Sequence, residues 1–373
     1  MFLRHLDKLL KYLKSILRLL QWLFQAIPLS KNLKFNLNKR ILAIWDLQTV
    51  PYSVGDILVL NEAMMCLRID YNADKIDICF VCDPQKPSRQ DFNSINSENY
   101  HYNLAALIPL VQINPHLGSF ILFDSYVSLE KFITDNIESY YVWPSIRHYA
   151  NKIEAYANNF DYVQQFYSHK KYIPYLSCLR LVIEWAYKFY KQNLNSQFPI
   201  VVHLRNSKNE PERNSKIDEW IAFFEFCNNK YPIKFLIICS ADEIDNRLRD
   251  YSNVMIMKDW YTTVEQDLSL IESSVMFMGG PSGPSTMALF QEVPYIIFNF
   301  RPSNETITKG SNLMFANNLQ RLIWEPETKE ILSTEFLEIF SKIDLSKWED
   351  KKQQFLSIRS VETRFRIGSS FRV

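Results

Sequence analysis

Short apolar runs alternate with helical stretches along most of the chain, and this alternation restricts the fold more than any other feature. The first runs are residues 40–45, 75–81 and 119–123, and a second series begins at residue 200. Strands separated by helices pair in parallel through right-handed crossovers. The pattern therefore predicts an α/β protein in which two Rossmann-like domains face a cleft.

The 373 residues are enough for two domains with extensions at both ends. We expect an amphipathic helix over residues 1–30, a first domain over 40–193, a second over 198–326 and a helical tail over 327–373. Residues 85–104 are polar and predict a loop, whereas residues 242–249 predict a short helix.

Charge is unevenly distributed, although 42 basic and 41 acidic residues nearly cancel. Residues 1–40 hold nine Lys or Arg and one Asp. The near-neutral total argues against a generally basic nucleic-acid binder, so no nucleic-acid partner is expected. A basic arm on an acidic body instead indicates an anionic partner for the arm alone.

The arm has the pattern of a helix lying in a membrane interface. Its polar face is almost entirely basic, and its other face is rich in leucine. No uncharged run reaches about 18 residues, so neither a spanning helix nor a secretory signal is predicted. A helix packed on the protein's own core is the alternative. The residues expected to contact anionic lipid are Arg4, Lys8, Lys11, Lys14, Arg18 and Trp22.

Six scattered cysteines do not form a disulfide framework, and a reducing compartment fits them best. Cys79 and Cys82 form a C-x-x-C sequence, but they lie in an apolar run that reads as a buried strand. Residues three apart on a strand face opposite ways, so these two predict core positions on opposite faces. No metal site is expected.

Glycine is scarce, with seven residues in the whole chain, yet three of them lie between residues 279 and 286. This segment follows a predicted strand and opens a predicted helix, where free N–H groups favour an anion such as phosphate. It matches neither a Walker A loop nor G-x-G-x-x-G. A tight turn that serves packing is the alternative. The residues expected at a phosphate are Gly279, Gly280, Ser282, Gly283, Ser285 and Thr286.

His203 and Arg205 end the first strand of the second series, at the sheet edge where open α/β sheets bind ligands. Arg205 can grip a phosphate with two N–H groups, and His203 can donate to a phosphate or leaving group. A structural core histidine is the alternative for His203. Lys208, Arg213 and Asn214, in the adjoining loop, are expected to be solvated.

Asp56 follows Gly55 at the start of the first predicted helix. An aspartate there is commonly a cap. The other interpretation directs its carboxylate into the interdomain cleft, where it can act as a general base toward an acceptor hydroxyl.

These patches together resemble a known family. The run Gly55-Asp56-Ile57-Leu58 resembles the opening of bacterial heptosyltransferases, which have the two-domain GT-B glycosyltransferase fold. Residues 279–294 resemble the family's segment that holds the donor diphosphate. The His203-x-Arg205 element is similar to the donor-gripping element of fucosyltransferase-like GT-B enzymes. The chain departs from the family segment at Pro281, where an acidic or hydroxyl residue is usual, and at Ser285-Thr286, where a histidine is common.

The resemblance implies an inverting glycosyltransferase, and the basic arm leads us to expect it at the cytoplasmic face of the cell membrane. It would move a sugar from a nucleotide diphosphate sugar to a lipid-linked or surface-glycan acceptor, without a metal or other cofactor. Asp56, His203 and Arg205 would be catalytic, and Ser282, Gly283 and Ser285 would bind the diphosphate. Lys258 is expected near the nucleotide base and Glu265 near the ribose. A nucleotide-sugar epimerase of the same fold and a non-catalytic membrane-associated scaffold are the competing hypotheses.

Overall fold

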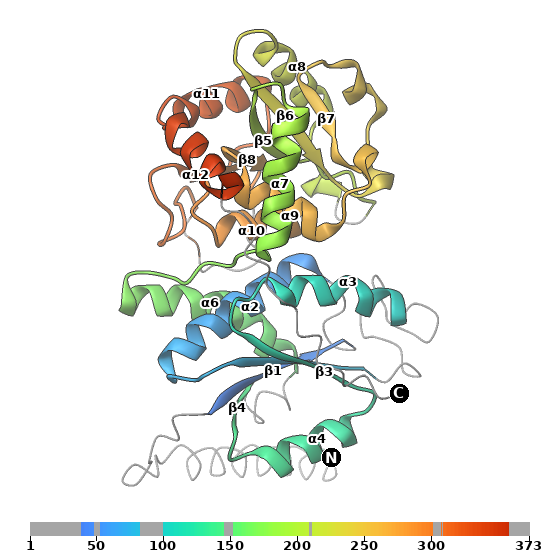
Figure 1. Cartoon of the computed structure of the whole chain (residues 1–373), viewed down its shortest axis with the longest axis vertical. Coiled ribbons are helices and arrows are strands. Elements are labelled where there is room, and N and C mark those ends of the chain that lie inside the picture. The colour runs from blue at the N-terminus through green and yellow to red at the C-terminus, as the bar shows by residue number, and fades with distance from the viewer. Residues whose placement is uncertain are drawn as a thin grey trace, which may run out of the picture.

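The computed structural model describes residues 39–47, 53–82, 100–144, 152–208, 211–300, 307 and 309–357. Two parallel sheets, each flanked by helices, are arranged one above the other along the long axis (Figure 1). The expected α/β fold with two domains is confirmed. The expected amphipathic helix over residues 1–30 falls outside the described residues.

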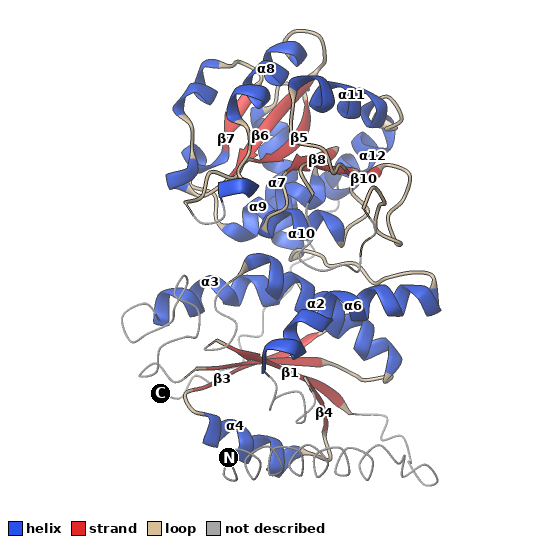
Figure 2. Ribbon diagram, turned by 180° about the vertical axis from the view of Figure 1, so that it is seen from behind, coloured by secondary structure: helices blue, strands red, loops and turns tan. Residues whose placement is uncertain are grey.

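The first domain is built on a four-stranded parallel sheet with the order β3-β2-β1-β4. Helices of the described part of the chain cover both faces of this sheet (Figure 2). The strands are β1 (Arg40–Asp46), β2 (Ile76–Val81), β3 (Leu117–Phe123) and β4 (Tyr140–Trp143). The helices facing the second domain are α2 (Val54–Asp70), α3 (Tyr100–Gln112) and α6 (Lys152–Lys170), and α4 (Tyr126–Asn136) lies on the other face.

The loop predicted over residues 85–104 is wrong at its end, because residues 100–104 belong to helix α3. The helix begins at Tyr100 and continues through Pro109. Leu104, Leu107 and Val111 are buried, and their spacing places them on one helix face. The polar start of the helix and its internal proline hid this short apolar face.

The cysteines follow the expectation. All six are buried and free of disulfide bonds. Cys79 packs in the apolar cluster beside α4, whereas Cys82 belongs to the cluster on the helix-rich side. Their placement on opposite faces confirms that the C-x-x-C sequence is part of the core.

The second domain has six parallel strands in the order β10-β9-β8-β5-β6-β7. Numbered within the domain, this is the Rossmann order 6-5-4-1-2-3. The strands are β5 (Phe198–His203), β6 (Ile233–Ile238), β7 (Val254–Ile256), β8 (Met276–Gly279), β9 (Tyr295–Ile297) and β10 (Gln320–Leu322). The helices include α8 (Ile217–Cys227), α9 (Val264–Ser273), α10 (Gly283–Leu289), α11 (Lys329–Phe340) and α12 (Leu345–Ser357).

Two details of this domain differ from expectation. The predicted helix at 242–249 is replaced by two 3-10 turns, η2 (Ala241–Glu243) and η3 (Asn246–Asp250). Asp245 separates them, and its carboxylate accepts from the backbone N–H of Arg247. Strand β10 was not expected, because three residues are too few to show a period.

The chain crosses between the domains before α7 (Arg180–Asn193), earlier than the expected boundary near residue 193. Helix α7 packs against α9 and α12 of the second domain. The crossing segment is held by Glu272, whose carboxylate accepts from Ser177 Oγ at 2.8 Å and Cys178 N at 2.7 Å. The first domain therefore ends with α6.

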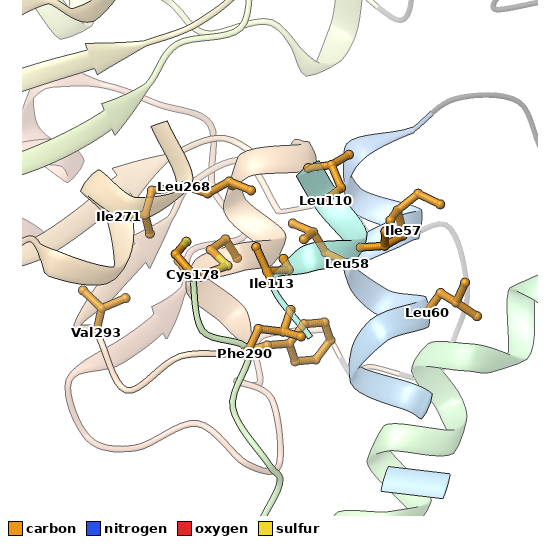
Figure 3. Close-up of a cluster of buried hydrophobic side chains, with 14 of the residues drawn as sticks. Ile57, Leu58, Leu60, Leu110, Ile113, Cys178, Leu268, Ile271, Phe290 and Val293 are labelled. Carbon is orange, nitrogen blue, oxygen red and sulfur yellow. The ribbon is translucent and has the colours of Figure 1, made fainter. Parts of the chain in front are cut away.

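A continuous apolar cluster joins the domains (Figure 3). Leu58 of α2 and Leu110 of α3 approach Leu268 and Phe290 from the second domain. The Phe290 ring lies 6.2 Å from that of Phe160 in α6. Each such buried side chain contributes about 1.5–3 kcal/mol to stability. The two domains therefore share part of one core.

We expect Phe290→Ala to lower the free energy of unfolding by about 3 kcal/mol or more, because it opens a cavity at this shared core. Since the core is shared, urea unfolding followed by circular dichroism is expected to remain a single transition at a lower midpoint. Phe226→Ala is the matched control, because Phe226 is only half-buried in α8. An equal loss in the two variants would contradict the shared core.

Candidate active site

The candidate site lies where the strand order of the second sheet reverses. Strands β5 and β8 are neighbours there, and His203 pairs with Gly279 at their carboxyl ends. Chain connections leave in opposite directions from this pair of strands, which is the position where open α/β sheets bind ligands. A Cβ atom at Gly279 would lie 2.7 Å from the carbonyl oxygen of His203. Glycine is therefore required where the two strands approach.

The turn after β8 is held by a chain of side-chain hydrogen bonds. Ser282 Oγ lies 2.9 Å from Nδ1 of His203 and 3.0 Å from Oγ of Ser285. Ser285 Oγ donates to the carbonyl oxygen of Gly280. Because each hydroxyl carries one proton, Ser285 must accept from Ser282, and Ser282 must accept from His203. The network thereby assigns the proton of His203 to Nδ1.

His203 thus donates to Ser282 and holds the turn. The sequence had instead suggested that it donates to a phosphate or leaving group. Its side chain is buried, and desolvation together with the charge of Arg205 lowers its pKa to about 4. At neutral pH the ring is uncharged, and Nε2 carries no proton to donate. His203 is a positioning residue in this arrangement.

Arg205 is fixed by the loop that follows β5. Its Nη1 donates to Oδ1 of Asn214 at 2.8 Å, and its backbone N–H donates to Ser215 Oγ at 3.1 Å. Asn214 also accepts from the backbone N–H of Ser207 at 3.0 Å. Lys208 is exposed, as expected, whereas Asn214 is not simply solvated, because its side chain holds the Arg205 guanidinium beside the end of β5.

Two further residues at the turn were not identified from the sequence. Arg213, expected to be solvated, donates from Nη2 to the carbonyl oxygen of Pro281 at 2.8 Å. Glu327 is buried beside Gly280 and accepts from the backbone N–H of Lys216 at 2.7 Å. Burial raises the pKa of Glu327. Neither residue belongs to a local motif, so no sequence signal pointed to them.

The first domain brings Asp56 to this turn through a close helix contact. Helix α2 packs against α10, and a methyl group at Gly283 would lie 2.7 Å from Cβ of Val54. A methyl group at Gly55 would lie 3.1 Å from Thr286 Oγ1. Bare glycine backbones let the two helix starts meet across the domain boundary.

Asp56 lies at the edge of this contact, in the first turn of α2. Its backbone N–H donates to Ser53 Oγ at 3.4 Å, so Ser53 is the N-cap of α2 and the Asp56 carboxylate is not needed for capping. The residue is exposed, yet the surrounding protein desolvates its carboxylate and raises its pKa. The hydrogen bond from Ser53 and the charge of Arg213 oppose this rise. The positive charge that acts on Asp56 thus comes from Arg213, which is hydrogen-bonded to the 279–286 turn.

Lys258 and Glu265 lie on the side of β7, two strands from β5. That separation is about 10 Å at the usual strand spacing. Lys258 Nζ donates to Asp267 Oδ2 at 2.6 Å and to the carbonyl oxygen of Thr262 at 2.8 Å. Its charge is therefore used to join the β7 loop to α9. Glu265 is half-buried in the first turn of α9.

A cavity of about 600 Å³ lies at the other end of the second sheet, near the amino ends of β8 and β9. It is lined by the interdomain segment around Leu176, by residues preceding β8 and β9, and by Trp348 of α12. Ligands of open α/β sheets bind at the carboxyl ends of the strands, so this cavity is separate from the candidate site.

The residues expected to contact lipid lie outside the described part of the chain. Among the described helices, none combines the length and hydropathy needed to cross a membrane.

We expect Gly283→Ala to destabilise the protein by about 1–3 kcal/mol, because its methyl group would overlap Val54 and force the helix starts apart. Differential scanning fluorimetry would show a lower Tm. Gly280→Ala is the matched variant, since its methyl group meets nothing nearer than Glu327 Oε1 at 3.7 Å. Equal melting temperatures for the two variants would show that the contact is loose.

No protein-family profile matches the sequence, and no curated protein matches it. Solved structures do. Escherichia coli ADP-heptose LPS heptosyltransferase II is 13% identical, with a TM-score of 0.52 over 83% of this chain and 99% of that one. A glycosyl transferase family 9 protein from Veillonella parvula is 14% identical, with a TM-score of 0.48 over 83% and 91%. A putative UDP-N-acetylglucosamine 2-epimerase from Listeria monocytogenes is 10% identical, with a TM-score of 0.39 over 85% and 91%. The chain therefore has the two-domain GT-B fold that the resemblance to heptosyltransferases implied.

Proposed function

We propose that the protein is a glycosyltransferase that moves a sugar from a nucleotide diphosphate sugar to a hydroxyl of a lipid-linked or surface-glycan acceptor. The observation that carries this proposal is the contact of Gly55, the residue before Asp56, with the 279–286 turn across the domain boundary. A carboxylate on one domain and an anion-binding turn on the other supply the two functions that sugar transfer requires. The fold shared with a heptosyltransferase is consistent with this chemistry.

The donor side is the second domain. The diphosphate would rest against Gly279, Gly280 and Gly283, with Arg205 supplying positive charge from the β5 loop. Negative charge grows on the diphosphate as the bond to the sugar breaks. Fixed donors and cations aimed at that charge stabilise the transition state without reorganising. His203, Ser282 and Ser285 keep this turn in place.

The acceptor side is the first domain. Asp56 would accept the proton of the acceptor hydroxyl while its oxygen attacks the anomeric carbon from the side opposite the diphosphate. Attack from that side inverts the anomeric configuration. Desolvation raises the pKa of Asp56, which makes the ionised carboxylate a stronger base than an ordinary aspartate. The arrangement gives each reacting group a protein partner and assigns no step to a metal.

The basic amphipathic arm extends the proposal to location. A helix of this pattern would hold the enzyme on the inner face of the cell membrane, where a lipid-linked acceptor is concentrated. The candidate lipid contacts are the basic residues of the arm, with Trp22 at its apolar boundary.

The donor is tested by a thermal-shift panel of nucleoside diphosphates and nucleotide diphosphate sugars. A ligand that binds only the folded protein raises the Tm in proportion to the logarithm of its concentration. The shifting nucleotide then selects the sugar donors for a transfer assay. Conversion of the free nucleotide sugar to its epimer, with no transfer, would instead identify an epimerase.

We expect Asp56→Asn to lower kcat by about 100-fold or more, because a general base contributes about 10²–10⁴ to the rate. The thermal shift with nucleoside diphosphate should be retained, since the donor site lies on the other domain. Asp135→Asn, at an exposed carboxylate of α4, is the control and should leave the rate unchanged. Wild-type glycan assembly supported by Asp56→Asn would favour a non-catalytic scaffold.

Deletion of residues 1–28 is expected to release the protein from anionic liposomes in a sedimentation assay. The removed segment contains five basic residues, each adding about 1 kcal/mol of attraction near an anionic surface. The full chain on uncharged liposomes is the control and should sediment less. Equal sedimentation of the full and shortened chains would exclude this membrane role.

A further inference from the structure

Arg213 occupies a position that links the two domains through the candidate site. It ends the short turn η1 (Pro211–Arg213) in the loop between β5 and α8. Its guanidinium donates to the carbonyl oxygen of Pro281, inside the phosphate turn. Gly55, the residue before Asp56 on the other domain, approaches Gly283, which lies two residues beyond Pro281. The charge of Arg213 lowers the pKa of Asp56. The same side chain is thus near both the proposed diphosphate site and the proposed base.

The backbone around Arg213 is held on several sides. The N–H of Asn214 donates to the carbonyl oxygen of Pro211 at 3.1 Å, which closes the turn. The side chain of Asn299, after β9, donates to the carbonyl oxygen of Glu212 at 3.3 Å. The carbonyl oxygen of Arg213 itself lies 3.8 Å from the position of a Cβ atom at Gly280. These contacts fix the backbone at Arg213, and the fixed backbone directs its side chain toward Pro281.

We propose that Arg213 couples the two halves of the site: it orients the phosphate turn through Pro281, adds positive charge where the diphosphate departs, and stabilises the ionised carboxylate of Asp56. This role rests on the proposed glycosyl transfer and gives that reaction a residue that the sequence patches did not include. A planar guanidinium suits all three tasks, because its five N–H donors can bind a carbonyl oxygen and an anion together.

The charge of Arg213 affects the pH at which the Asp56 carboxylate ionises. Among the residues that the structure describes, the groups that act on the Asp56 carboxylate are the Ser53 hydroxyl from its own helix start and the Arg213 guanidinium from the second domain. Burial raises the pKa of Asp56, and both groups lower it. Loss of the Arg213 charge therefore raises the pKa of Asp56 further. The base then loses its negative charge at a higher pH as the solution is acidified.

The experiment compares Arg213→Gln and Arg213→Lys with wild type by two measurements that need no activity. Isothermal titration with inorganic pyrophosphate reports the diphosphate site. The ¹³C chemical shift of the Asp56 carboxyl, assigned by its loss in Asp56→Asn, reports the ionisation of the base as pH is varied. Arg247→Gln is the matched control, because Arg247 is an exposed arginine paired with Asp245 and Asp218.

We expect Arg213→Gln to weaken pyrophosphate binding by about tenfold or more, as for other charge-assisted hydrogen bonds, and to move the Asp56 titration to higher pH. Arg213→Lys should keep the Asp56 titration near that of wild type, because the charge is retained. It should still weaken pyrophosphate binding, because the planar fork is lost. Arg247→Gln should change neither quantity.

An unchanged Asp56 titration and unchanged pyrophosphate affinity in Arg213→Gln would overturn the proposal. If Arg213→Gln does not fold, pyrophosphate affinity of Arg213→Lys equal to that of wild type would overturn it. Failure of the glycosyltransferase assignment has a different signature. In that case the wild-type protein transfers no sugar, while Arg213→Gln still shifts the Asp56 titration and supports the coupling.

Discussion

The contact between the starts of α2 and α10 is the constraint on which the site depends. Gly55 and Gly283 face each other so closely that a side chain on Gly283 would overlap its neighbours. A glycine pair at this point lets two backbones approach where larger residues would separate them. The approach brings the first turn of α2 in one domain beside the 279–286 turn of the other. It places Asp56 one residue beyond a contact with the turn whose Pro281 carbonyl accepts from Arg213.

The same boundary is apolar on one side of this contact and polar on the other. Leu58, Leu110 and Phe290 lie buried in the apolar interior of the interface (Figure 3). The polar groups lie at the carboxyl ends of β5 and β8. There a series of hydrogen bonds from His203 through Ser282 and Ser285 to the Gly280 carbonyl gives them partners. An unsatisfied polar group here would cost about 1–3 kcal/mol. The hydrogen-bonded turn is therefore part of what stabilises the domain junction as well as the site.

Much of the fold follows from local patterns. Strands β1, β2 and β3 lie on the first three apolar runs, and the turn before α10 was found because three glycines cluster in a chain that has few. Features with weak local signals were missed. Helix α3 has an internal proline, and β10 is three residues long. Both are stabilised by packing against the rest of the domain, which no short window of sequence contains.

The site divides in the same way. Gly55, Asp56 and the 279–286 turn lie in compact motifs, whereas the roles of Arg213 and Glu327 depend on contacts across long stretches of chain. In the resemblance to heptosyltransferases, Pro281 stands where an acidic or hydroxyl residue is usual. In three dimensions a carboxylate is nevertheless present beside the turn, since Glu327 Oε1 lies 3.7 Å from the position of a Cβ atom at Gly280.

Glu327 also accepts from Lys216 N at the start of α8, so the carboxylate ties the turn to the β5 loop. A group missing from a motif can thus be supplied by a segment remote in sequence, because the chemistry of a site depends on position in space.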